Sequence, residues 1–176
     1  MDLYLEPHAA FPASEGRHVN VTIARQGGML DITYVIEGST ELLTIPPPAR
    51  PYRTDGLWRS TCLELFVRGP AAEYYEFNFA PSTEWAAYRF SGRREGMEPL
   101  ALDAPPRIEV SDEGYALIVS VQLEGLGSDP LTVGLSAVVA EKDGTLSYWA
   151  LKHPEGAPDF HDPACFALEL PAPNGP

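Results

Sequence analysis

The sequence predicts an all-β protein, a single-domain antiparallel β-sandwich of jelly-roll type with about eleven strands. Apolar residues recur at every second position, which is the period of a strand rather than of a helix. The apolar segments are short and end at turn residues, and 18 prolines among 176 residues leave little room for helices. We expect one domain over residues 1–176, with a frayed tail at 171–176.

The first strands form a predicted hairpin. Val19–Ala24 and Leu30–Ile36 alternate between apolar and polar residues on either side of a Gln-Gly-Gly turn at 26–28. A third short strand is expected over Glu41–Ile45, where three consecutive prolines stop it.

The central strands hold the polar residues of interest. Strands are predicted over Cys62–Val67, Tyr74–Phe79 and Trp85–Phe90, separated by Gly-Pro and Pro-Ser turns. Alternation places Glu64 opposite Leu63 and Leu65, and places Glu76 and Asn78 opposite the apolar Tyr75, Phe77 and Phe79. The third strand offers two faces, one with Trp85 and Arg89 and the other with Tyr88. The remaining predicted strands are Arg107–Val110, Tyr115–Leu123, Leu131–Ala140, Thr145–Leu151 and Cys165–Leu170.

Charge and composition exclude several classes of function. The chain has 12 basic and 25 acidic residues, a formal net charge of −13. This balance disfavours nucleic acids and anionic membranes as partners and favours neutral or cationic ligands. Two cysteines do not make a disulfide framework, and no nucleotide-binding or serine-hydrolase motif is present. With no signal peptide and no apolar run long enough for a membrane span, we expect a cytoplasmic protein; a protein partner stays unspecified.

A polar and aromatic sheet face suits sugar binding. If the central strands are neighbours, one face of the sheet gathers Glu64, Glu76 and Asn78 with Tyr88 or Arg89 and a tryptophan. Carboxylates and amides bond to hydroxyl groups, while aromatic rings stack on the apolar face of a pyranose. Two alternatives stay open: a merely solvated sheet face, and a carboxylate pair that hydrolyses a glycosidic bond.

The segment 153–162 concentrates ionisable residues. It holds His153, His161 and three carboxylates among prolines. A loop at the rim of a binding site, a plain surface loop and a transition-metal site are the three interpretations, and we favour the first.

The motifs together resemble the bacterial DOMON-like family, whose members are uncharacterised. The segments that carry the resemblance are Asp55–Val67, Tyr74–Ser82, Trp85–Tyr88, Leu135–Val139, Ser147–Pro154 and Pro158–His161. This family is similar in fold to family-nine carbohydrate-binding modules and to haem-binding DOMON cytochrome domains. The first resemblance implies that Asp55, Trp58, Asn78 and Trp149 hold a sugar.

The resemblance also implies two cofactor alternatives. Haem would use Met97 with His153 or His161 as axial ligands, and structural calcium would draw on Asp55 and Asp159. We expect no cofactor, no metal and no catalytic residue. The predicted function is non-catalytic binding of a saccharide on the concave face of one sheet. The predicted ligand-binding residues are Asp55, Trp58, Glu64, Glu76, Asn78, Trp85, Tyr88, Arg89, Trp149, His153 and His161.

Overall fold

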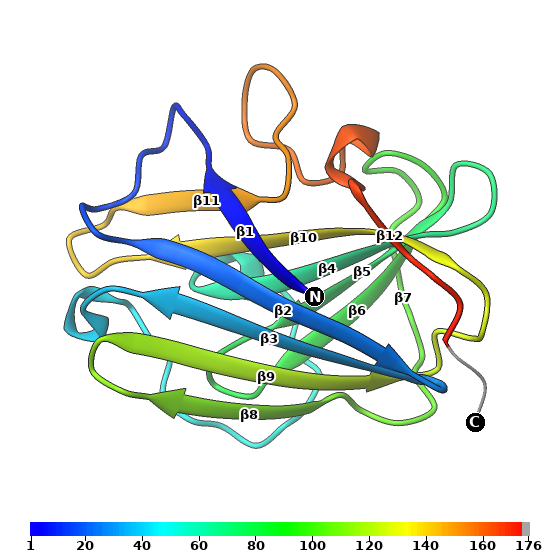
Figure 1. Cartoon of the computed structure of the whole chain (residues 1–176), viewed down its shortest axis with the longest axis horizontal. Helices are drawn as coiled ribbons and strands as arrows, with labels where there is room; N and C mark the ends of the chain where they lie inside the picture. Colours follow the sequence, from blue (N-terminus) through cyan, green and yellow to red (C-terminus); the bar gives the residue numbers. More distant parts are fainter. Residues whose placement is uncertain (174–176) are drawn as a thin grey trace.

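Twelve strands build two facing sheets in a computed structural model that describes residues 1–173. One sheet has the order β1-β2-β3-β9-β8 and the other has the order β7-β6-β5-β4-β10-β11-β1, with β12 beside β10 (Figure 1). All pairings between these strands are antiparallel. The strands are β1 (Asp2–Pro7), β2 (His18–Gln26), β3 (Met29–Glu37), β4 (Cys62–Arg68), β5 (Tyr74–Phe79), β6 (Trp85–Phe90), β7 (Glu98–Pro99), β8 (Arg107–Asp112), β9 (Ala116–Glu124), β10 (Leu131–Ala140), β11 (Leu146–Ala150) and β12 (Leu168–Leu170).

Strand β1 connects the two sheets at one edge. Its first four residues pair with β2, whereas Glu6 and Pro7 pair with β11. The same strand therefore contributes backbone hydrogen bonds to both layers, which closes one side of the sandwich.

The main core lies between the sheets and follows the alternation of the strands. In β3 every second side chain is buried, and these include Ile32, Tyr34 and Ile36. In β4 the side chains of Leu63 and Leu65 point into the same core. The Tyr34 hydroxyl, which lies inside this apolar layer, donates a hydrogen bond to the backbone carbonyl of Glu64 at 2.8 Å. Its polar group is thereby satisfied, as a buried hydroxyl requires.

A second apolar cluster covers the opposite face of the β4-containing sheet. It joins Phe66, Tyr74 and Phe90 on the strands to Phe160 and Phe166 on the segment that follows β11. Six of the seven residues of β4 are buried as a result, on both faces of the strand. This face is therefore covered by loops, and the alternative of a merely solvated sheet face is wrong.

The structure confirms the all-β class and the antiparallel sandwich, and it corrects individual strands. Glu41–Ile45 is not a strand: Thr40–Leu42 forms a 3-10 turn, and a single bridge from Leu43 to Glu141 follows. The strand predicted over Cys165–Leu170 is shorter, because Pro163–Cys165 forms a 3-10 turn capped by Asp162. Strands β1 and β7 were not predicted; both contain a proline and lie in short segments.

Two remaining expectations concern the chain as a whole. Among residues 1–173, no helix has the length and apolar character to cross a membrane. The predicted frayed tail at 171–176 falls partly on residues 174–176, which lie outside the described residues; 171–173 carry no regular secondary structure.

Candidate functional site

A cavity of about 390 Å³ lies on the loop-covered face of the β4-containing sheet. Strands β4, β5, β6, β10 and β11 form its floor, and three segments outside the strands close around it. Its size falls within the range of small-molecule sites. The lining residues are Trp58, Glu64, Glu76, Phe90, Arg94, Met97, Val138, Tyr148, Pro158, Phe160 and His161. We call this space the outer-sheet cavity.

Glu64 lies at the floor of the cavity with half of its carboxyl group unpaired. The Ser136 hydroxyl on β10 donates to its Oε2 at 3.0 Å. Its Oε1 has no hydrogen-bond partner among residues 1–173, and the residue is only 3% exposed. Burial, together with the nearby charge of Glu76, raises the pKa of Glu64 from 4.5 to about 8. Glu64 is therefore largely protonated at neutral pH.

Glu76 is the second carboxyl group on the floor. Asn78 Nδ2 donates to its Oε1 at 2.8 Å, and His161 Nε2 lies 3.8 Å from its Oε2. Burial raises the pKa of Glu76 to about 7, although the Asn78 hydrogen bond opposes that shift. Asn78 itself is fully buried, and its Oδ1 has no hydrogen-bond partner among the described residues. The floor thus keeps unused hydrogen-bonding capacity, which is uncommon for buried polar atoms.

A hydrogen-bonded chain orients His161 toward Glu76. The backbone N–H of Arg94 donates to the Tyr74 hydroxyl at 3.1 Å, and that hydroxyl lies 2.7 Å from His161 Nδ1. Because the tyrosine oxygen already accepts one hydrogen bond, its own hydrogen is free to go to Nδ1, which leaves the His161 proton on Nε2. Burial and the charge of Arg94 lower the pKa of His161 to about 4. His161 is therefore neutral at pH 7.

Ion pairs between two loops cover one side of the cavity. Arg94 Nη2 lies 2.9 Å from Asp159 Oδ1, and Arg93 Nη1 lies 2.9 Å from Asp162 Oδ2. Both arginine side chains are more than half exposed, whereas both aspartates are mostly buried. These pairs join the loop after β6 to the loop after β11, and they balance the arginine charges at the mouth of the cavity.

Trp58 forms an aromatic wall at the rim, supported from outside the cavity. Its indole is 38% exposed and packs edge-to-face on Tyr88, with 6.2 Å between ring centroids. The Tyr88 hydroxyl donates to Asp55 Oδ1 at 2.7 Å, and the Arg53 guanidinium lies over the Tyr88 ring. Tyr88 and Asp55 therefore hold Trp58 in place and do not themselves line the cavity.

The structure brings together only part of the predicted set. Four predicted residues line the outer-sheet cavity, two more contact these four, and Asp55 contacts one of those two. The lining residues are Trp58, Glu64, Glu76 and His161; the supporting residues are Asp55, Asn78 and Tyr88.

The structure places four predicted residues outside the outer-sheet cavity. Trp149 points into the main core, because it is paired with Ala137, and its Nε1 donates to Ser147. Trp85 packs against the same core, and Arg89 projects away to an ion pair with Glu73. His153 lies 2.8 Å from the Glu6 carbonyl oxygen, outside the cavity lining.

Seven lining residues are not among the predicted saccharide-binding residues, although Met97 was named as a haem ligand. Phe90, Val138 and Tyr148 follow from strand alternation once the register is known, since each shares a face with a residue on the floor. Arg94, Met97, Pro158 and Phe160 come from loops, where no periodicity predicts a direction. These seven residues are Phe90, Arg94, Met97, Val138, Tyr148, Pro158 and Phe160.

The implied metal and haem ligands are only partly assembled. Met97 and His161 line the same cavity, whereas His153 does not. Asp55 and Asp159 take part in separate interactions, with Tyr88 and with the two arginines. Within residues 1–173, no group of three or more His, Cys, Asp or Glu side chains is arranged to hold a metal ion.

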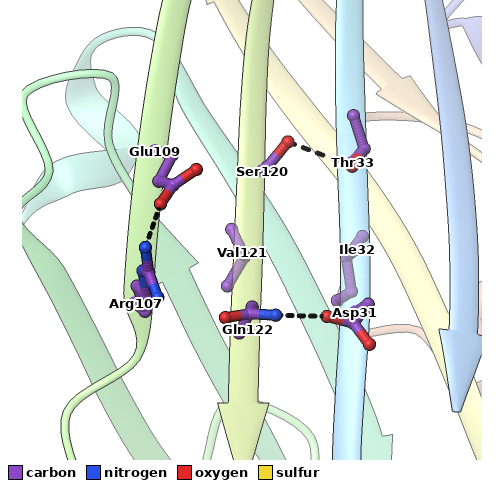
Figure 2. Close-up of a pocket in the computed structure, with 8 residues that line it drawn as sticks. All are labelled: Asp31, Ile32, Thr33, Arg107, Glu109, Ser120, Val121 and Gln122. Atoms are coloured by element: carbon purple, nitrogen blue, oxygen red, sulfur yellow. Dashed lines mark hydrogen bonds and ion pairs between the residues drawn. The ribbon is translucent and has the colours of Figure 1, made fainter. Parts of the chain in front are cut away.

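A depression on the other sheet differs from the outer-sheet cavity, because its polar side chains are paired with one another. Figure 2 shows polar side chains that pair between β3 and β9, and an Arg107–Glu109 pair within β8. Asp31 accepts from Gln122 at 2.8 Å, and Thr33 lies 3.1 Å from Ser120. These groups satisfy each other, so this surface leaves little for a ligand to bind, unlike the outer-sheet cavity.

Two solved structures share the fold. A protein from Bacteroides uniformis that is proposed to bind carbohydrate superposes with a TM-score of 0.66 at 15% identity, covering 94% of this chain and 83% of its own. A family 9 carbohydrate-binding module from Caldicellulosiruptor kristjanssonii, in complex with glucose, superposes with a TM-score of 0.50 at 9% identity, covering 82% and 71%. The chain matches no model of a known protein family and no curated protein. These similarities establish the fold, and the DOMON-like resemblance stays a prediction.

Proposed function

We propose that the protein binds a saccharide in the outer-sheet cavity and does not transform it. One observation carries the proposal: aromatic walls face buried carboxyl groups that have unpaired oxygens. A sugar ring offers C–H faces to aromatic rings such as Trp58 and hydroxyl groups to carboxyl oxygens. The similarity of the fold to a module that holds glucose supports this ligand class.

The carboxyl pair favours binding over hydrolysis. Hydrolysis of a glycosidic bond needs one protonated and one ionised carboxyl group, so catalytic environments push the two pKa values apart. Here burial raises the pKa of both Glu64 and Glu76, to about 8 and about 7. Neither environment lowers a carboxyl pKa, as one that holds a nucleophile or base ionised would do.

The test is a thermal-shift screen against mono- and disaccharides, followed by titration calorimetry of any response. A ligand that binds only the folded protein raises the melting temperature. We expect the response to disappear in Trp58→Ala and to persist in Trp85→Phe. Trp85 is a matched control because its ring lies against the core and its Nε1 has no hydrogen-bond partner among the described residues.

Two results would overturn the proposal. A screen without any saccharide response contradicts saccharide binding, and a response that survives Trp58→Ala contradicts binding in this cavity. Haem is a second candidate, favoured by the presence of Met97 and His161 in one cavity. A haem titration separates the two, because bound haem gives a Soret absorption band and a saccharide does not.

A further inference from the structure

The floor of the outer-sheet cavity has two carboxyl groups and no cation beside them. Among residues 1–173, no Lys or Arg nitrogen lies within 4.0 Å of Glu64 or Glu76. The one basic group that close is His161, 3.8 Å from Glu76, and it is neutral at pH 7. The arginines at the mouth are already paired with Asp159 and Asp162. Arg94 at the mouth therefore attracts both carboxyls only from a distance, and no positive charge of the described residues contacts the floor.

The two carboxyl groups are placed where one ligand group can reach both. Glu64 is paired with Asn78 across β4 and β5, and Glu76 precedes Asn78 by two residues on the same face. Such diagonal neighbours lie about 7–8 Å apart at the backbone, within reach of each other's long side chains. Glu64 Oε1 and Glu76 Oε2 accept no hydrogen bond from residues 1–173, and both residues are at least 95% buried.

We propose, resting on the saccharide-binding function above, that the ligand is an amino sugar whose free ammonium group binds between Glu64 and Glu76. An ammonium group supplies the missing charge and three hydrogen-bond donors, and buried carboxylates are stable only when they are paired in this way. Trp58 and Tyr148 line the same cavity, and aromatic faces suit a cationic ligand. The net charge of −13 also favours a cationic ligand over a phosphorylated one.

Binding of the ammonium group displaces protons. Without a ligand the raised pKa values keep Glu64 largely protonated and Glu76 partly protonated near pH 7, so the cation replaces a proton. The other ionisable groups near the pair come from six elements. They are Tyr34 on β3, Cys62 on β4, Tyr74 on β5, Tyr148 on β11, Arg94 in the loop after β6, and Asp159 and His161 in the loop after β11.

Four of these neighbours have shifted pKa values that keep them from releasing a proton at pH 7. Burial raises the pKa of Tyr34, Cys62 and Tyr74 above their usual values, so they stay protonated at pH 7. His161 is deprotonated at that pH, because its pKa lies near 4. Proton release on binding at pH 7 therefore reports on Glu64 and Glu76.

The experiment is titration calorimetry of the whole chain at pH 7 with glucosamine, glucose and N-acetylglucosamine. We expect glucosamine to bind at least about tenfold more tightly than glucose, because a charge-assisted hydrogen bond contributes at least that difference in affinity. N-acetylglucosamine lacks the charge and should therefore bind no more tightly than glucose. Repeating the titration in two buffers of different ionisation enthalpy should show protons released with glucosamine and none with glucose.

Matched variants connect the preference to the carboxyl pair. Glu64→Gln and Glu76→Gln should each remove the preference for glucosamine, and Glu109→Gln, an exposed carboxylate on β8, should retain it. If a floor variant does not fold, the proton release of the unmodified chain decides the question.

The possible failures are distinguishable. Equal affinity for glucose and glucosamine, or heats that do not depend on the buffer, overturn the ammonium site and leave saccharide binding intact. Loss of all response across the saccharide panel overturns both proposals.

Discussion

Replacing the two floor carboxyls should flatten the dependence of stability on pH above neutrality. An unfolded Glu releases its proton near pH 4.5, whereas folded Glu64 and Glu76 keep theirs up to about pH 8 and about pH 7. Between these values the folded state binds more protons than the unfolded state, so the free energy of unfolding falls as the pH rises. The stabilising effect of protonation is complete below pH 4.5 and is lost through the folded pKa values.

The magnitude follows from the size of the pKa changes. Each pKa unit corresponds to about 1.4 kcal/mol, so the full change for Glu64 corresponds to about 5 kcal/mol. The part lost between pH 6.5 and 9 is about 3 kcal/mol for the two carboxyls together. This window avoids His161, whose lowered pKa makes stability change in the opposite direction between pH 4 and 6.5.

Urea unfolding followed by circular dichroism at pH 6.5, 7.5 and 9 measures this loss. We expect the unmodified chain and Glu109→Gln to lose a few kcal/mol over the window, and Glu64→Gln/Glu76→Gln to lose much less. If the double variant loses as much as the unmodified chain, the carboxyls are not protonated in the folded protein and the electrostatic account of the cavity floor is refuted.

Three further predictions test how the cavity is supported. Trp149→Ala should lower the free energy of unfolding by about 3–5 kcal/mol in urea titrations, because the ring fills the main core; a change of less than 1 kcal/mol would contradict that position. Gly134→Ala should lower the melting temperature, since a Cβ there would lie 2.8 Å from a backbone carbonyl, and Gly28→Ala, with open space, should not. Tyr74→Phe should cost about 1 kcal/mol in the same urea assay, because it removes the hydroxyl that joins β5 to the two covering loops; an unchanged midpoint would show that this link contributes no stability.

Alternation along each central strand was enough to separate the carboxyl groups from the core. Because side chains in a strand point to opposite faces in turn, Glu64 must lie opposite Leu63 and Leu65, wherever the strand sits in the fold. The same reasoning kept Glu76 and Asn78 together. Thus the pair at the floor of the cavity was predictable before any contact was known.

Alternation does not say which face of a strand meets the other sheet. Trp149 and Tyr148 occupy the two faces of β11, and both are aromatic, so either could have lined a site. The pairing of Trp149 with Ala137 decided the matter by placing it in the main core. On β6, likewise, the structure places Tyr88 on the cavity side of the sheet. Trp85 and Arg89 lie on the other face of the strand.

By itself, the sequence determined the all-β class, most of the strands and the common face of the two buried carboxyls, since each follows from local periodicity. The tertiary structure alone decided that loops bearing Arg94 and Phe160 cover that face and make a cavity of it. It also decided that the carboxyls have no cation beside them. Both properties depend on ion pairs and packing between residues more than 60 positions apart, which no local pattern encodes.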